Sequence, residues 1–135
     1  MKTLLPMLLV LLVAFPGQAE EGLSMVAEAL ALVEKTGFRF YEAELHRLQG
    51  ELLLKQAAPD SRQAETCLHR ALDLAHSQQA KLLELRAAMS LSRLWHQHGK
   101  KEEACRLLKE IYGWFTEGFD TPDLQEAKAL LEELM

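Results

Sequence analysis

The sequence predicts an all-α protein made of stacked helical hairpins. Its 135 residues include only seven glycines and four prolines, and the residue types that favour helices, such as leucine, alanine and glutamate, are abundant. Apolar residues recur at intervals of three and four, which is the spacing of one helix face. Parts of the second half also repeat parts of the first half at a shift of about 40 residues. These observations favour one domain of repeated helix–turn–helix units.

Six helices are expected after the first twenty residues, and local signals indicate where they begin and end. Gly37 and Gly99 stand where a helix end favours a left-handed residue. Asp60 has the spacing of an N-cap toward the helix that follows it. Thr121, Pro122 and Asp123 supply an N-cap, a first-turn proline and a first-turn carboxylate for the last helix. The helices are expected at about 22–35, 39–57, 61–78, 81–98, 100–115 and 122–134.

The internal repeat divides these helices into hairpins. Two pairs of segments align: 42–56 with 84–98 at a shift of 42, and 64–71 with 104–111 at a shift of 40. The difference of two residues falls in the turn at 57–61, where insertions are tolerated. A helix–turn–helix unit with a period near 40 is typical of a stacked helical repeat. The prediction is two hairpins, at about 39–78 and 81–115, and a C-terminal capping helix at 122–134.

The repeat places small and large residues in a pattern that resembles the tetratricopeptide (TPR) family. The small residues are Gly50, Ala64, Ser92 and Ala104, and the large ones are Leu53, Leu68, Trp95 and Leu108. The resemblance implies an α–α superhelix over residues 20–135, with a concave groove that binds a protein partner. Ile111 departs from the pattern, since the family has a small residue there. The longer period looks like the extended repeats of bacterial regulatory proteins.

Three segments carry a narrower resemblance. Residues 44–54, 85–88 and 112–121 look like the C-terminal TPR tail of large bacterial regulatory proteins of the predicted ATPase and adenylate/guanylate cyclase type. The resemblance covers the tail and none of the upstream domains. It therefore implies a repeat module, and neither cyclase nor ATPase activity is expected of it.

The first nineteen residues are predicted to be a secretory signal peptide. Lys2 precedes an apolar run at 4–15, and Pro16, Gly17 and Ala19 follow as a helix break and a small-residue cleavage site. The run is shorter than the roughly 20 apolar residues of a membrane span, which favours cleavage over a stable anchor. The alternative is an uncleaved, buried helix. The chain is secreted or periplasmic if the leader is used and cytoplasmic otherwise.

Composition and motifs argue against several function classes. The formal net charge of −5 is unfavourable for binding nucleic acid. No phosphate-binding loop, HExxH or nucleophile elbow occurs, so we expect neither an enzyme nor a cofactor. His96 and His98 point to different sides of a helix, which argues against a shared metal. Cys67 and Cys105 lack CxxC spacing, and a disulfide between them in an oxidising compartment stays an open alternative.

The family resemblance and the self-alignment together identify candidate partner-binding residues in the groove. These are Arg47, Lys55, Arg86, Met89, Arg93 and His96. Arg86 and Arg93 are seven residues apart and share one helix face, which would suit an acidic segment or a C-terminal carboxylate. An equal alternative is that they are only solvated or pair with Glu44 and Glu51 of the neighbouring helix.

Two further functions are kept beside the protein-interaction module. One is a structural remnant or self-associating tail, because a short array has exposed end faces that favour a homodimer. The other is a small-molecule regulatory domain, suggested by aromatic residues near the C-terminus. Among these, Trp95 and Phe115 are expected in the core, whereas Trp114 and Phe119 are expected to fold back and lock the final helix.

Overall fold

The computed structural model describes residues 18–135, and within that range the chain forms helices and no strand. The prediction of an all-α protein is confirmed. The helices are α2 (Ala19–Thr36), α3 (Glu42–Leu54), α4 (Ser61–Ser77), α5 (Lys81–Gln97), α6 (Lys101–Tyr112) and α7 (Pro122–Leu134). Apart from its last two residues, the predicted signal peptide lies outside the described part of the chain.

Several helix ends follow the local chemistry that predicted them, but the Thr121 hydroxyl donates to the Gly118 carbonyl and does not cap α7. Gly37 ends α2 in the left-handed region at φ 74°, and its N–H donates to the Val33 carbonyl at 2.8 Å. The Asp60 carboxylate accepts from the Gln63 N–H at 3.0 Å at the start of α4. Helix α3 is shorter than predicted, because residues 38–41 belong to the loop after α2 and the helix ends at Leu54.

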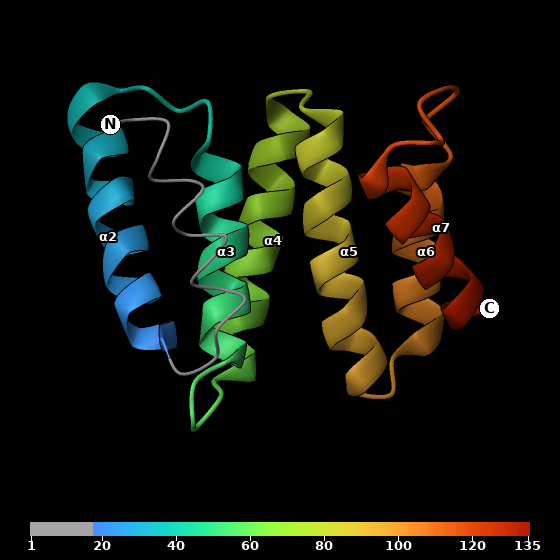
Figure 1. Ribbon diagram of the computed structural model, residues 1–135, viewed down its shortest axis with the longest axis horizontal. Helices are drawn as coiled ribbons and strands as arrows, with labels where there is room; N and C mark the ends of the chain where they lie inside the picture. Colours follow the sequence, from blue (N-terminus) through green and yellow to red (C-terminus); the bar gives the residue numbers. More distant parts are fainter. Residues whose placement is uncertain (1–17) are drawn as a thin grey trace.

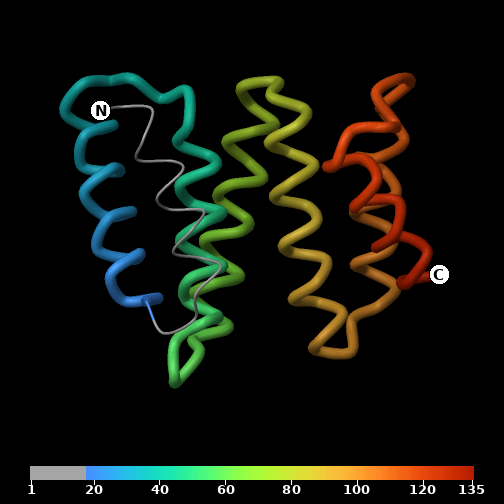
Figure 2. The backbone as a smooth tube through the Cα atoms, viewed as in Figure 1, coloured from blue at the N-terminus to red at the C-terminus, as the bar shows by residue number. Residues whose placement is uncertain are grey.

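The helices form two layers, and their order along the molecule is the same as their order in the sequence (Figure 1). Each helix packs against the next one in antiparallel fashion, as the backbone trace in Figure 2 also shows. In addition, α3 contacts α5 and α5 contacts α7, so these three helices lie side by side and run in the same direction. Within residues 18–135, no contact of similar extent joins α4 to α6. Helices α3, α5 and α7 therefore form one continuous layer.

Small residues allow the two helices of each hairpin to approach closely at the same relative position. A Cβ atom added to Gly50 on α3 would lie 2.9 Å from Leu68 Cγ and 3.1 Å from the Ala64 carbonyl oxygen of α4. At the corresponding position of the second hairpin, the buried Ser92 hydroxyl donates to the Ala104 carbonyl of α6 at 3.2 Å. The pairing of Gly50 with Ser92 in the sequence is thus reflected in the packing.

The apolar faces of the helices are buried where neighbouring helices meet. One cluster joins α5, α6 and α7 around Leu85, Leu108 and Leu131, and another joins α2 to α3 around Val26 and Leu52. A fully buried leucine or valine side chain stabilises the folded state by about 1.5–3 kcal/mol relative to an exposed one. Each helix buries its apolar residues against its neighbours, so the core forms only when the helices are stacked.

The two cysteines lie on second helices of successive hairpins and are free thiols. Cys67 is buried on α4, and Cys105 is half-buried on α6. Burial raises the pKa of the Cys67 thiol above its ordinary value, which keeps it protonated at neutral pH. Its sulfur lies 3.4 Å from the Gln49 side-chain oxygen of α3. Cys67 therefore contributes to the contact between α3 and α4 as a small apolar side chain.

Gly50→Ala tests the close approach of α3 to α4. Helix propensity alone would make this change stabilising by about 1 kcal/mol. Because the new methyl group would press on Leu68 and on the α4 backbone, we instead expect a net loss of about 1–3 kcal/mol in the free energy of unfolding. Chemical denaturation measures it, and Glu51→Ala on the same helix is the control. A Gly50→Ala protein that is more stable than the wild type would contradict the packing.

Lowering the pH is expected to weaken the contact between α3 and α4 through His46. Burial, and next the charge of Arg70, lower the pKa of this imidazole below its ordinary value of 6.5, against weaker opposing effects of Gln49 and Glu42. Arg70 Nε also donates to His46 Nε2 at 3.2 Å, which requires an unprotonated acceptor. The unfolded chain therefore binds a proton more readily than the folded chain, so stability falls as the pH drops through the unfolded value.

The measurement is the free energy of unfolding at several pH values between about 7.5 and 5.5, on either side of the ordinary histidine pKa. His46→Gln keeps a polar side chain that does not titrate. We expect the variant to lose part of the pH dependence of the wild type. The same slope in both proteins would show that His46 does not contribute to it.

Candidate functional site

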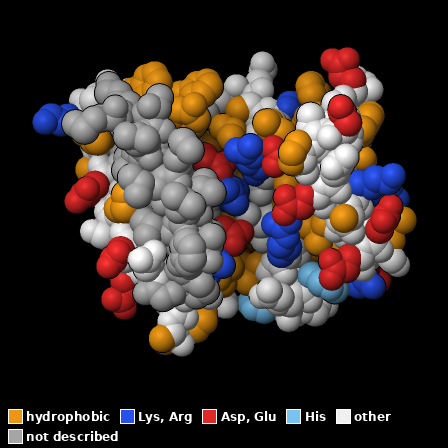
Figure 3. Space-filling view, viewed as in Figure 1, with side chains coloured by type: hydrophobic (Ala, Val, Ile, Leu, Met, Phe, Trp, Pro, Cys, Tyr) orange, Lys and Arg blue, Asp and Glu red, His pale blue; other side chains and the backbone are white. Residues whose placement is uncertain are grey.

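The exposed side of the α3–α5–α7 layer carries a row of paired charges. Figure 3 shows basic and acidic side chains interleaved across the middle of this face. On α3, Arg47 donates to the Glu44 carboxylate through both Nε, at 2.8 Å, and Nη2. Arg47 Nη1 also lies 3.3 Å from the Ser90 hydroxyl of α5. The row begins with a guanidinium that links two helices of the layer.

Arg86 occupies the middle of the row and connects α5 to α7. Its Nε and Nη2 donate to Asp123 Oδ2 at 3.1 and 3.0 Å, and its Nη1 lies 3.8 Å from Glu44 Oε2. Burial lowers the pKa of the guanidinium, but the hydrogen bond and charge of Asp123, with the charges of Glu44 and Glu126, raise it more. The net pKa lies above the ordinary value, so Arg86 stays positively charged.

Arg93 closes the row at a more exposed position. Its Nη2 donates to Glu126 Oε1 on α7, and both side chains are about half exposed. Three arginines, Arg47, Arg86 and Arg93, thus face three carboxylates across the layer. Because the row is electrically balanced, it offers no surplus of positive charge to an acidic segment. The sequence suggested Glu44 and Glu51 as alternative partners of Arg86 and Arg93. Glu44 does lie near Arg86, but the hydrogen-bonded partners of these two arginines are Asp123 and Glu126 on α7.

The remaining predicted binding residues are more dispersed. Met89 is only 3% exposed and belongs to the core between α5 and α7, so its side chain is not on the surface where we expected a partner. Met89 lies one turn after Arg86 on α5, but its side chain packs into the buried cluster of α5, α6 and α7 instead of lying beside the arginines. His96 is half-buried, and its Nδ1 has no hydrogen-bond partner among the described residues. Lys55 is the C-cap of α3, whereas Arg86 lies near the start of α5, at the opposite end of the layer.

Exposed aromatic side chains gather at the end of the molecule where α3, α5 and α7 begin. We call this set, together with the neighbouring Leu82, the aromatic end. Its residues are all exposed: Phe38, Phe40, Tyr41, Leu82, Trp114 and Phe119. The loops between α2 and α3, between α4 and α5, and between α6 and α7 all lie at this end (Figure 1). Isolated surface aromatics are ordinary, but several at one end of a small domain mark an interaction surface.

The aromatic residues of each loop also contact one another. Phe40 and Tyr41 meet edge to face with ring centroids 4.7 Å apart, and Trp114 meets Phe115 in the same way at 5.2 Å. The ammonium group of Lys81 lies 5.4 Å from the Trp114 ring centroid. Trp114 was expected to lock the final helix in place. Its side chain is instead 58% exposed and contacts Phe115 and Lys81.

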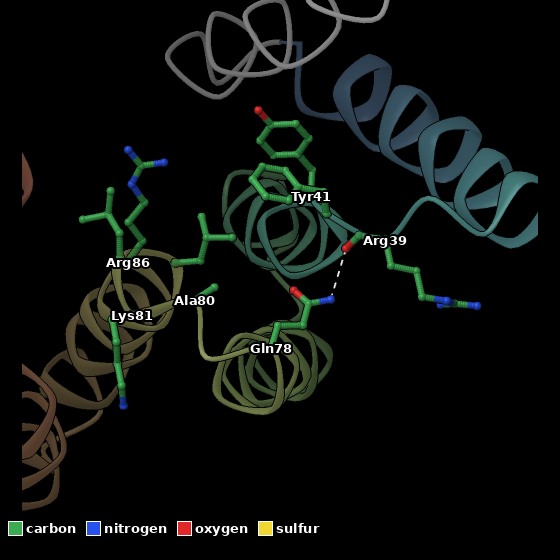
Figure 4. Close-up of a pocket in the computed structure, with 9 residues that line it drawn as sticks. Arg39, Tyr41, Gln78, Ala80, Lys81 and Arg86 are labelled. Atoms are coloured by element: carbon green, nitrogen blue, oxygen red, sulfur yellow. Dashed lines mark hydrogen bonds between the residues drawn. The ribbon is translucent and has the colours of Figure 1, made fainter.

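A cavity of about 800 Å³ opens between the α2–α3 loop and the start of α5 (Figure 4). The Gln78 amide donates to the Arg39 carbonyl at 3.1 Å, which ties this loop to the end of α4. The Arg39 side chain is directed away from the cavity toward α2, where it pairs with Glu34 and Glu42. The cavity is lined by Arg39, Phe40, Tyr41, Gln78, Ala80, Lys81, Leu82, Leu83 and Arg86. Its surface is mainly apolar, with Arg86 at the junction with the charged row.

Several residues of this surface were missed by reasoning from the sequence. Asp123 was identified only as a first-turn carboxylate of the last helix, and Glu126 was not singled out. Phe40 and Tyr41 were expected at the start of a helix, and Phe38 was not singled out. Three aromatic residues so close behind the helix-ending Gly37 are unusual and could have indicated an exposed aromatic loop. That composition was the available signal. The pairing of α5 with α7 had no equivalent signal, because it depends on how the hairpins stack.

The described part of the chain contains neither a cluster of metal-binding side chains nor a helix that could span a membrane. Residues 18–135 hold no group of three or more His, Cys, Asp or Glu side chains arranged to bind a metal ion. Within the same range, no helix combines the length and the apolar composition needed to cross a bilayer. Comparison with known proteins found no matching family model, no matching curated protein and no matching solved structure.

The pairing of Arg86 with Asp123 is expected to help hold α7 against α5. A double-mutant cycle with Arg86→Gln and Asp123→Asn measures the coupling directly. We expect a coupling energy of at most about 1 kcal/mol, because the pair is partly exposed to solvent. The cycle between Arg93 and Glu126 is the comparison and should give a smaller value, since those side chains are more exposed. Equal couplings, or none for Arg86, would contradict the ranking.

Proposed function

We propose that this chain is a protein-interaction module of the TPR type, and that its role is binding rather than catalysis. The layered arrangement supports the proposal: first helices of successive hairpins lie side by side, and each hairpin closes at a small residue, Gly50 or Ser92. Helical arrays of this kind use the exposed side of one layer to recognise a partner. The sequence resemblance points to the same arrangement.

The observation that carries the proposal is the surface of the α3–α5–α7 layer. It combines a balanced row of charges with an apolar cavity at the end where the helices begin. A binding site for a peptide needs apolar contact for affinity and a few placed polar groups for orientation. The cavity supplies the first, and the row ending at Arg93 and Glu126 supplies the second.

The charge balance also defines the partner segment. An acidic tail would have to displace Asp123 and Glu126 from their arginines, which costs the pairs already formed. A segment with an apolar side chain for the cavity and alternating or uncharged polar groups along the row would keep those pairs. We therefore propose a partner helix or extended segment of this mixed character.

Capture from an extract of the native host tests the function. Immobilised wild-type chain is compared with Arg93→Glu/Glu126→Arg, which reverses the end of the row while keeping an opposite-charge pair. We expect quantitative mass spectrometry to show a partner whose enrichment falls about tenfold with the variant, which corresponds to about 1.4 kcal/mol of binding free energy. Circular dichroism confirms that the variant is folded.

Arg106→Glu is the matched control, because Arg106 is an exposed arginine on α6, outside the α3–α5–α7 layer. It should leave the enrichment of the partner unchanged. A protein that is captured equally by wild type, row variant and control does not use this surface. Absence of any protein captured above the level of a blank support would refute the proposed function itself.

A further inference from the structure

We propose that the face formed by α2 and α3 is a docking site for residues 1–17 of this chain, which supply the first helix of an N-terminal hairpin. The sequence leaves two alternatives for this segment, a leader that is removed or a helix that is buried. The register of the internal repeat and the burial of α2 favour the second alternative for the intact chain. This face is separate from the cavity and the charged row, so the proposal does not depend on the proposed function.

Helix α2 has the sequence register of a second helix. Residues 29–32 align with residues 71–74 of α4 at a shift of 42, which is the shift that also relates α3 to α5. The buried residues of α2 fall at the buried positions of α4. The matching pairs are Gly22 with Ala64, Val26 with Leu68, Ala29 with Ala71, and Val33 with Ala75.

The buried face of α4 is covered by two first helices, α3 of its own hairpin and α5 of the next hairpin. Helix α2 lies at one end of the array and packs against α3, which is the first helix of the next hairpin (Figure 1). Within residues 18–135 no first helix precedes α2, yet Gly22 is buried at the position that matches Ala64. The place of the hairpin partner of α2 therefore falls to residues 1–17.

Helix α3 turns an apolar side toward the same place. On α5, Ser90 marks the side that faces the preceding first helix, because its hydroxyl lies 3.3 Å from Arg47 Nη1 of α3. The residue of α3 that matches Ser90 is Leu48, which is buried and belongs with Leu45 and Leu52 to the cluster shared with α2. Leucines thus stand on α3 where α5 contacts a preceding first helix.

The sequence of residues 1–17 suits this place. Its apolar run ends at Pro16, directly before α2, much as Pro59 separates α3 from α4. A helix over about residues 4–13 has Pro6 in its first turn, where a proline removes no helical hydrogen bond. Because the run is apolar on all sides, burying one face of it against α2 and α3 is favourable.

The repeat also identifies the closest contact of the docked segment. In each described hairpin two small residues face each other, as Gly50 and Ala64 do. At the shift of 42, the residue that matches Gly50 is Leu8 and the residue that matches Ala64 is Gly22. Glycine is unfavourable within a helix, but here it leaves room for a leucine where the other hairpins have a smaller residue.

Docking of the segment has a consequence for the surface of the protein. The α3–α5–α7 layer gains a fourth first helix beside α3. Removal of the segment would uncover Gly22, Val26 and Leu48, which would then be open to another apolar helix. The intact chain and the processed chain would therefore present different surfaces to a partner.

Engineered cysteines test the contact in the full chain, with its intact mass confirmed and with Cys67 and Cys105 replaced by alanine. Leu8→Cys/Gly22→Cys should form an intramolecular disulfide, because closely packed helices bring two Cα atoms within the roughly 4.4–6.8 Å that a disulfide spans. Leu8→Cys/Ser24→Cys is the control, since Ser24 is exposed on the other side of α2. Mass spectrometry after alkylation should show the first disulfide forming at least about tenfold faster, because a docked pair has the higher effective concentration.

Gly22→Leu tests the same contact through stability. Helix propensity alone would make this change stabilising. Because the new side chain would overlap Leu8, we instead expect the melting temperature of the full chain to fall by about 4 °C or more. Adding Leu8→Ala makes room for the new leucine and should recover most of the loss. Thermal unfolding followed by circular dichroism measures both effects.

Three results would each overturn the proposal. The first is equal rates of disulfide formation in the two cysteine proteins. The second is a Gly22→Leu chain at least as stable as the wild type, and the third is a loss of stability that Leu8→Ala does not restore. These substitutions lie outside the charged row, so failure of this proposal and failure of partner capture are separate results.

Discussion

The close approach of the two helices in each hairpin is the contact on which the other features depend. At Gly50 an added methyl group would overlap Leu68, and at Ser92 the hydroxyl bonds directly to the α6 backbone. These contacts fix how far α3 lies from α4 and α5 from α6. Since the first helices then meet one another, the same packing determines the α3–α5–α7 layer and places its exposed residues in one surface.

That surface illustrates how a stack of helices makes a site from residues distant in sequence. Arg86 and Asp123 are on different structural units, yet they form the central contact of the charged row. The balance of three arginines with three carboxylates has a functional consequence. The proposed partner would therefore bind through shape and apolar contact rather than net charge, because the carboxylates that pair with the arginines are already in the chain.

The aromatic end follows from the direction of the helices. Helices α3, α5 and α7 begin at the same end, so the loops that precede them are brought together there. Aromatic residues in these loops, such as Phe40 and Trp114, are exposed and lie outside the buried clusters. The exposed rings give this end an apolar character that differs from the charged row along the helices.

The sequence by itself determined the helical class and most helix ends, because helix periodicity and caps such as Asp60 act over short distances. It also led to the prediction that Arg47, Arg86 and Arg93 belong to one groove. Only the tertiary structure decided that Met89 is buried, that α7 supplies the partners of Arg86 and Arg93, and that the exposed aromatics share one end. Those features depend on the rotation of each helix and on the stacking of hairpins, and both are set by packing between residues far apart in the chain.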